Sequence, residues 1–232
     1  MDSRYYTEYA AAAIRGFLLR HPEIELPDQS LVLRDFHSLT DADCEAILDL
    51  AHERGIKIHH FKRSSRMLPR VSRVLGFLRG ISPESILDVG SGRGVFLLPL
   101  LESFPWVDVY SADILDKRVE MLSDISRGGV DRLHVMRADV CDRPLPERSV
   151  DVVTMLEVLE HIPRVEDAVR AATQMARKFV VVSVPSKEDD NPEHIHLLTR
   201  ERLTAMFASC GVHRLSFDAV PGHLLTVANL GG

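Results

Sequence analysis

Residues 85–94 read SILDVGSGRG, and this stretch decides the fold. A short apolar run contains Asp88, three glycines follow at positions 90, 92 and 94, and an apolar helical pattern occupies residues 95–104. Glycines between a strand and a helix permit a tight turn and let a ligand approach backbone N–H groups closely. In a doubly wound α/β sheet such a turn lies at the carboxyl ends of the strands, where ligands bind. The stretch therefore predicts the first strand of such a sheet, with a ligand site at its end.

The alternation of strand and helix continues along the chain. β-Branched runs and helical patterns follow one another at residues 108–112, 116–127, 132–138, 151–155, 165–177, 179–184 and 200–209. Such alternation is typical of βαβ units with right-handed crossovers, which build a parallel sheet covered on both faces. The last two strands, at 213–220 and 223–230, are joined only by Pro221 and Gly222, which is too short for a parallel crossover. The sequence predicts an α/β, Rossmann-like sheet that is mostly parallel and ends in an antiparallel hairpin.

The beginning of the chain has a different pattern. Two helices are expected, at residues 5–20 and 41–54, and Thr40 is the expected N-cap of the second. We therefore divide the chain into an N-terminal helical segment, residues 1–64, and an α/β domain, residues 65–232. The helical segment is expected to cap the substrate side of the domain.

The composition of the 232 residues is that of a globular protein, with 45% hydrophobic and 27% charged residues. No apolar run reaches the roughly 18 residues of a membrane span, and the N-terminal stretch lacks the basic start of a secretory signal. Cys44, Cys141 and Cys210 are far apart and form no CxxC pair, which fits a reducing compartment and argues against a thiolate zinc site. We expect a cytoplasmic protein that does not enter a membrane.

Charge is unevenly distributed along the chain. The formal net charge of −6 argues against broad affinity for duplex nucleic acid, yet residues 57–79 contain seven Lys or Arg and no Asp or Glu. This basic segment has two interpretations. Either Arg66, Arg70 and Arg73 form the solvated face of a helix whose other face is apolar, or the segment binds an anionic substrate.

The residues around the glycine loop restrict the kind of ligand. The chain has no P-loop sequence, and Val95 stands where a GxGxxG dinucleotide fingerprint has its third glycine. Asp88 before the loop favours a cationic ligand group over a pyrophosphate. Asp113 ends the second strand, where an acid can bind both hydroxyls of a ribose, and Asp139 ends the third strand, where it can accept a hydrogen bond from an exocyclic amine. An amino group, a ribose and an adenine in this order are the groups of S-adenosylmethionine (SAM).

Together with the hairpin, these motifs resemble those of class I SAM-dependent methyltransferases. The resemblance covers residues 65–232 and rests on ILDVGSGRG, SADI, RADVCDRPLPERSVDVVTMLEVLEHIP and VVVSVP, in this order. It implies a seven-stranded sheet of order 3-2-1-4-5-7-6 and SAM as the cofactor. Within the family, quinone-pathway O-methyltransferases carry an arginine at the spacing of Arg70, where it meets the cofactor's carboxylate. The cofactor-binding residues that the resemblance implies are Arg70, Asp88, Gly90, Ser91, Gly92, Asp113, Ile114, Asp139, Val140 and Leu156.

A second group of residues follows the fourth strand. A hydroxyl acceptor needs a base or a metal ion to become a good nucleophile, and Glu157, Glu160 and His161 would share one face if the chain turned helical there. With His194 downstream, this pattern resembles the metal centre of small-RNA 3′-terminal 2′-O-methyltransferases and the Glu-x-x-Glu-His element of quinone-pathway O-methyltransferases. The resemblance implies Mg²⁺ or Mn²⁺ bound by these four residues, with Glu157, His161 and His194 as catalytic candidates. The alternative is that the acid and histidine only brace the loop under the cofactor.

These features lead to one expected function and two alternatives. We expect a SAM-dependent methyltransferase that methylates an oxygen of a small or medium-sized acceptor. The first alternative is a metal-dependent 2′-O-methyltransferase of an RNA 3′ end, whose phosphates the basic segment would bind; an aromatic content of 6% argues against it, because few side chains are left for base stacking. The second alternative is a SAM-binding scaffold without catalytic activity.

Overall fold

The computed structural model describes residues 4–26, 29–56, 68–188 and 190–231. The strands are β1 Ser85–Val89, β2 Asp108–Asp113, β3 Leu133–Arg137, β4 Val150–Leu156, β5 Ala176–Pro185, β6 Arg214–Val220 and β7 His223–Asn229. The helices are α1 Arg4–Arg20, α2 Ser30–Leu33, α3 Asp41–Glu53, α4 Pro69–Ile81, α5 Leu97–Ser103, α6 Asp116–Arg127, α7 Val165–Met175 and α8 Arg200–Ser209. Single 3-10 turns form η1 Phe36–Ser38, η2 Val140–Asp142 and η3 Leu159–His161.

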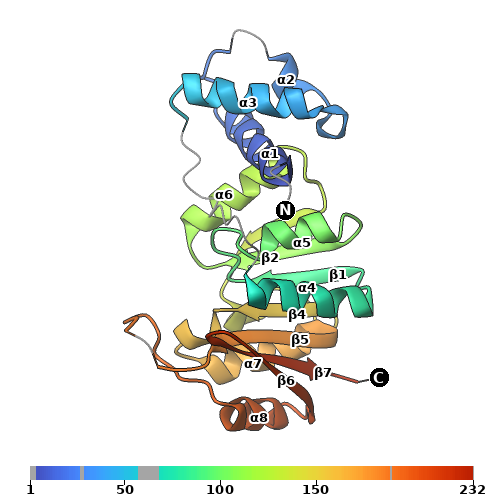
Figure 1. The fold of residues 1–232 in the computed structure, drawn as a ribbon, viewed down its shortest axis with the longest axis vertical. Coiled ribbons are helices and arrows are strands. Elements are labelled where there is room, and N and C mark those ends of the chain that lie inside the picture. Colours follow the sequence, from blue (N-terminus) through green and yellow to red (C-terminus); the bar gives the residue numbers. More distant parts are fainter. Residues whose placement is uncertain (1–3, 27–28, 57–67, 189, 232) are drawn as a thin grey trace.

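The seven strands form one sheet of order β3-β2-β1-β4-β5-β7-β6 (Figure 1). The pairs among β1 to β5 are parallel, whereas β7 is antiparallel to both β5 and β6. The predicted Rossmann-like sheet with a terminal antiparallel hairpin is therefore confirmed, including its order. As a result, the carboxyl ends of β1, β2, β3, β4 and β5 lie along one edge of the sheet, together with the start of β7.

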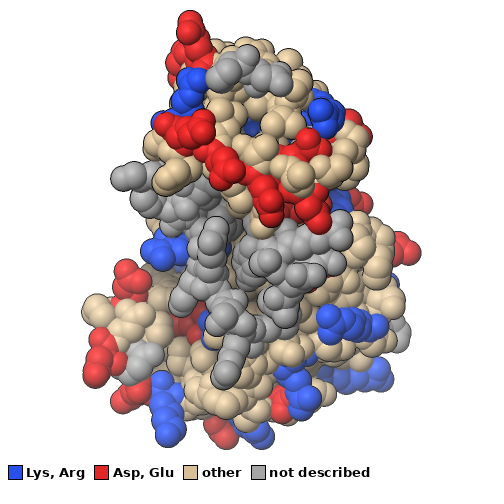
Figure 2. Space-filling view, turned by 45° about the horizontal axis from the view of Figure 1, so that its top comes forward, with Lys and Arg blue, Asp and Glu red and all other residues tan. Residues whose placement is uncertain are grey.

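Helix α1 packs on α6 at the β3 end of the sheet, and α2 and α3 pack on α1 (Figure 1). The backbones of α1 and α6 approach so closely that a Cβ on Gly16 would lie 1.8 Å from the Asp124 carbonyl oxygen, and one on Gly128 would lie 1.8 Å from that of Ala12. Buried Arg15 joins the elements by donating to the Gly128 carbonyl oxygen at 2.6 Å. Acidic side chains gather in a band over this end of the molecule (Figure 2).

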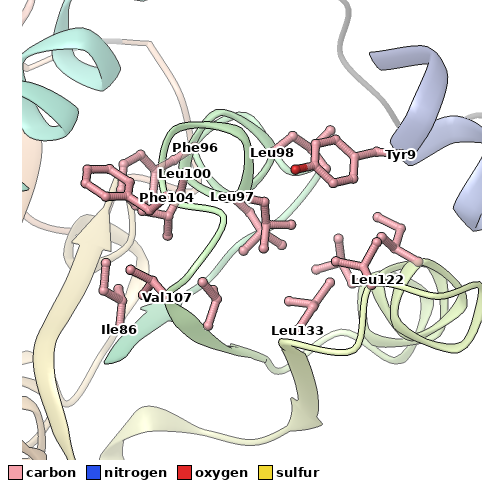
Figure 3. Close-up of a cluster of buried hydrophobic side chains, with 14 of the residues drawn as sticks. Tyr9, Ile86, Phe96, Leu97, Leu98, Leu100, Phe104, Val107, Leu122 and Leu133 are labelled. Atoms are coloured by element: carbon pink, nitrogen blue, oxygen red, sulfur yellow. The ribbon is translucent and has the colours of Figure 1, made fainter. Parts of the chain in front are cut away.

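Hydrophobic residues cover both faces of the sheet, because neighbouring residues of a strand point to opposite sides. On one face Ile86 and Val152 pack with α4, α5 and α6, and Tyr9 of α1 joins the same cluster (Figure 3). On the other face Leu87 and Val153 pack with α7 and α8. The N-terminal helical segment thus shares a hydrophobic core with the α/β domain.

The predicted helix signals agree with the described helices. Thr40 caps α3 in a capping box, in which its hydroxyl accepts from the Asp43 N–H and the Asp43 carboxylate accepts from the Thr40 N–H. The apolar stripe of α4 is buried, and Arg73 on its other side is exposed. Among the described residues, no helix is long and apolar enough to cross a bilayer.

Candidate functional site

The glycine loop after β1 has a backbone that requires glycine. Gly90, Gly92 and Gly94 have φ values of 66°, 55° and 74°, in the left-handed region that side chains disfavour. A Cβ on Gly90 would also lie 2.6 Å from a methyl group of Val158. The Gly90 N–H donates to the Ala112 carbonyl oxygen at 2.7 Å and so joins the loop to the end of β2. Both the backbone conformation and the close approach of Val158 therefore require glycine in this loop.

Asp88 lies beneath this loop, only 2% exposed. Its carboxylate accepts hydrogen bonds from the Ser91 hydroxyl (2.7 Å) and from the Thr154 hydroxyl (2.8 Å). Burial raises the pKa of Asp88 from 3.8 to about 7, although both hydroxyls favour the charged form. Near neutral pH the carboxyl group is thus divided between its neutral and charged forms.

Asp113 at the end of β2 holds the glycine loop from the other side. One carboxylate oxygen accepts from the Gly92 N–H (3.0 Å) and the other from the Leu115 N–H (2.9 Å). Each oxygen keeps a further lone pair, so the side chain can still bind a ligand hydroxyl. Ile114, the next residue, is 58% exposed.

Asp139 at the end of β3 is already engaged within the protein. Its oxygens accept from the Cys141 N–H (2.8 Å), which caps η2, and from the Arg164 guanidinium (3.0 Å). Burial raises the pKa of Asp139, but these hydrogen bonds outweigh that effect and lower the pKa on balance. Val140 beside it is buried. The predicted hydrogen bond from an adenine amine would be a third interaction of the Asp139 carboxylate, beside the cap of η2 and the ion pair with Arg164.

A pocket of about 180 Å³ opens beside the glycine loop, between α4 and the end of β4. Its lining consists of Arg70, Val71, Asp88, Gly90, Ser91, Gly92, Arg93, Val95, Phe96, Leu156 and Glu157. Predicted site residues from three separate stretches of sequence, Arg70, the glycine loop and the end of β4, thus lie around one hollow. Asp113, Ile114, Asp139 and Val140 lie outside this lining, at the ends of the next two strands.

A larger open groove of about 810 Å³ lies between α4 and the hairpin β6–β7. Its lining is mostly apolar and includes none of the predicted site residues. Arg73, from the basic segment, lies at this groove and pairs with Asp218 of β6. We therefore place the site at the smaller pocket, where the carboxyl ends of the strands and the predicted residues coincide.

Glu157 does not share a helical face with Glu160 and His161, contrary to the expectation. Its φ of 60° is left-handed, and the 3-10 turn η3 begins only at Leu159. The carboxylate instead accepts from the Ser183 hydroxyl (2.7 Å) and pairs with His223 Nε2 (2.8 Å). The predicted four-ligand set is thereby reduced to three residues.

Glu160, His161 and His194 come together as predicted. One ligand atom of each lies within 4.8 Å of the others, and Glu160 is fully buried. His161 Nδ1 lies 2.9 Å from the Glu193 carbonyl oxygen, which can only accept, so Nδ1 carries the hydrogen and Nε2 has a lone pair. A carboxylate with two imidazoles, one of them oriented by a backbone carbonyl, is a donor set that fits a divalent cation.

The contacts of several other residues show what these residues do in the structure. His196 bonds through Nε2 to the Ile162 carbonyl oxygen (3.0 Å) and through Nδ1 to Arg202 (3.4 Å), as a loop histidine would. Of the basic segment, Arg66 lies outside the described residues. Thr154, Ser183 and His223 hold the two acids of the pocket but belong to no sequence motif. What they share is a place on β4, β5 or β7 near the site.

The chain is similar in sequence to known methyltransferases. The family described as a methyltransferase domain matches residues 58–213. The ubiquinone biosynthesis O-methyltransferase of Azoarcus sp. (strain BH72) is 29% identical over 147 residues, which are 59% of this chain and 58% of that protein. The ribosomal RNA small subunit methyltransferase G of Dehalococcoides mccartyi (strain CBDB1) is 31% identical over 111 residues, 46% of this chain and 44% of that protein.

A solved structure has the same fold. An O-methyltransferase family protein from Burkholderia thailandensis superposes with a TM-score of 0.59 at 12% identity, over 82% of this chain and 60% of that one. The chain spans less than two thirds of the length of the two curated relatives named above. The family match covers the glycine loop, the strand-end acids and the turn after β4. The chain belongs to the class I SAM-dependent methyltransferases.

Proposed function

We propose that this protein transfers a methyl group from SAM to an oxygen atom of a small or medium-sized acceptor. The observation that carries the proposal is the pocket of about 180 Å³ that gathers Arg70, the glycine loop, Leu156 and Glu157 at the carboxyl end of the sheet. The relative from Azoarcus, by its name an O-methyltransferase, supports oxygen as the acceptor atom.

In this proposal the cofactor lies across the ends of three strands. Gly90, Ser91 and Gly92 face its amino-acid end with Leu156, Asp113 binds the ribose hydroxyls, and Asp139 and Val140 lie at the adenine. The bound SAM supplies a methyl group that its sulfonium already activates. The protein's contribution is then to align the acceptor with that methyl group and to exclude water.

The acceptor oxygen is proposed to lie on the side of η3. His161 Nε2 has the lone pair that a general base requires, because Nδ1 is held by the Glu193 carbonyl oxygen. The His194 ring is beside it, with a centroid distance of 4.8 Å. These two histidines are the proposed proton acceptors for a hydroxyl group, whereas Glu157 belongs to the cofactor pocket.

Binding measurements test the proposal at the ribose. Isothermal titration calorimetry should show 1:1 binding of SAM and of its demethylated product. Asp113→Ala should weaken that binding by about 1–3 kcal/mol, because ligand hydroxyls lose a charged acceptor. Asp108→Ala, at the opposite end of the same strand, is the matched control and should bind as the wild type does. A folded wild-type chain that binds neither ligand would refute the family's cofactor for this protein.

A second candidate is metal-dependent methylation of an RNA 3′ end. The cluster of Glu160, His161 and His194 favours it, since these residues would hold Mg²⁺ or Mn²⁺, which orients acceptor oxygens and lowers the pKa of a hydroxyl group. The band of acidic side chains over the N-terminal helices opposes binding of a phosphate backbone on that face (Figure 2).

The metal can be tested apart from the acceptor. Added Mn²⁺ should raise the melting temperature of chelator-treated protein, and His194→Ala should abolish that rise. His196→Ala is the control, because both nitrogens of His196 have protein partners. If Mn²⁺ leaves the wild-type melting temperature unchanged, the three residues brace the loop and the RNA candidate is lost with the metal. Binding of SAM without transfer to any hydroxyl or RNA acceptor would leave the scaffold alternative.

A further inference from the structure

Glu157 has a backbone conformation that its neighbours hold in place. Its φ of 60° is unfavourable for a residue with a Cβ. Three contacts fix it: its N–H donates to the Ser183 carbonyl oxygen (2.8 Å), Oε1 accepts from the Ser183 hydroxyl (2.7 Å), and Oε2 pairs with His223 Nε2 (2.8 Å). Such conformations persist only where the surroundings over-determine them, and they concentrate at functional sites.

The partners of this carboxylate come from two neighbouring strands. Ser183 is fully buried in β5, and His223 opens β7 opposite Pro185. His223 Nδ1 lies 3.1 Å from the Pro221 carbonyl oxygen, so each ring nitrogen faces an acceptor. The imidazole is thereby held between the hairpin turn and the Glu157 carboxylate.

This arrangement places an anionic group in the pocket of the glycine loop. Of the two acids in the lining, Asp88 is 2% exposed, and its carboxylate accepts from two hydroxyls. Burial also raises the pKa of Asp88 to about 7. The Glu157 side chain is 24% exposed and can meet a ligand. Arg70 supplies a cation in the same lining.

The lining has cations in Arg70 and the more exposed Arg93, and an accessible anion in Glu157. Opposite charges around a small pocket fit the zwitterionic end of an α-amino acid. We propose that Glu157, positioned by Ser183 and His223, binds the α-ammonium group of SAM. Arg70 then faces the α-carboxylate, and the C-terminal hairpin takes part in cofactor recognition through His223. The inference rests on the proposed function, because it concerns the amino-acid end of the same cofactor.

Two ligands separate this inference from the proposed function. S-adenosylhomocysteine has the amino-acid end, and 5′-methylthioadenosine lacks it. In calorimetry with a chelator present, Glu157→Gln should weaken binding of the first about ten-fold or more, the effect of losing a charged hydrogen bond, and leave the second unchanged. Glu45→Gln, an exposed acid on α3, is the control and should change neither. An equal effect of Glu157→Gln on both ligands, or no effect, overturns the inference; a wild type that binds neither overturns the proposed function too.

Variants of His223 test its positioning role. His223→Leu removes the donor to Glu157 and should weaken S-adenosylhomocysteine about three- to ten-fold, whereas His223→Gln keeps a donor and should restore most of the affinity. Glu157→Gly removes the side chain and the backbone strain together, so it should fold yet lose the preference for S-adenosylhomocysteine. If the wild type shows that preference only after Mg²⁺ is added, Glu157 is a metal ligand and the inference is overturned.

Discussion

Asp88 makes the stability of the protein depend on pH, because burial raises its pKa from 3.8 to about 7. Between these values the native state holds a proton that the unfolded state releases. The free energy of unfolding that Asp88 contributes is therefore fully present below about pH 4 and falls as the pH rises to about 7. The Ser91 and Thr154 hydroxyls that bond its carboxylate would bond an amide as well.

We therefore expect Asp88→Asn to remove this dependence. The difference in unfolding free energy, wild type minus variant, should decrease by up to about 1.4 kcal/mol per pH unit between pH 4 and 7. Chemical denaturation at unit pH intervals measures it. Asp131→Asn, at an exposed acid, should run parallel to the wild type. Parallel curves for Asp88→Asn would show that the buried carboxyl group titrates normally.

At this scale the sequence predicted positions better than orientations. It placed Glu157, Glu160 and His161 at the end of the fourth strand, and three of the four proposed cation ligands do meet. The helical turn that would have brought Glu157 to the same face does not form, because three contacts to Ser183 and His223 hold that residue in a left-handed conformation. His223 could not be found from spacing, since its approach to Glu157 depends on the pairing of β7 with β5.

The elements themselves followed from local patterns. The predicted bounds of β1, α6 and α8 agree with the structure to the residue. Helix α5 begins at Leu97 rather than at residue 95, because the turn after the glycine loop continues through Phe96. Strand β5 begins at Ala176, earlier than residue 179, since pairing with β4 extends it beyond its apolar run. For β5 the end was set by tertiary pairing, which the local pattern does not contain.

The contact between α1 and α6 gives a prediction at the scale of elements. Gly16→Ala would put a methyl group 1.8 Å from the Asp124 carbonyl oxygen, so the two helices must separate. We expect a loss of about 1–3 kcal/mol in unfolding free energy, the usual cost of overpacking. Gly76→Ala in α4 meets nothing within 4 Å and should instead gain about 0.5–1 kcal/mol from helix propensity. Urea denaturation measures the unfolding free energy of both variants. If Gly16→Ala is as stable as the wild type, α1 and α6 are not in close contact.

At the scale of the whole molecule, one hydrophobic core contains residues from both sides of the predicted domain boundary at residue 65. Tyr9, Ala12 and Ala13 of α1 belong to the cluster that also contains Leu122 and Ile125 of α6. Removal of the N-terminal helices would expose this apolar surface. A chain of residues 65–232 would contain all seven strands and every residue proposed to contact the cofactor. This shorter chain would be destabilised by the apolar surface that the N-terminal helices no longer cover.

We expect this shorter chain to be less stable than the full one and to bind a hydrophobic dye such as ANS. Circular dichroism melting and dye fluorescence, with the full chain as reference, measure both effects. A melting temperature equal to that of the full chain, without dye binding, would instead make residues 65–232 an independent domain and the helices an appendage.

The place of β7 between β5 and β6 has a consequence for the order of events during synthesis. Of the seven strands of this sheet, β7 leaves the ribosome last, and it is not an edge strand but an inner one. Until it emerges, β5 has no partner on its outer side, β6 has none at all, and Glu157 lacks His223. A chain made only as far as β6 can thus build the glycine loop and β1 to β5, but its Glu157 is held by Ser183 alone. The same strand therefore completes the sheet and the contacts of Glu157 in the proposed cofactor site.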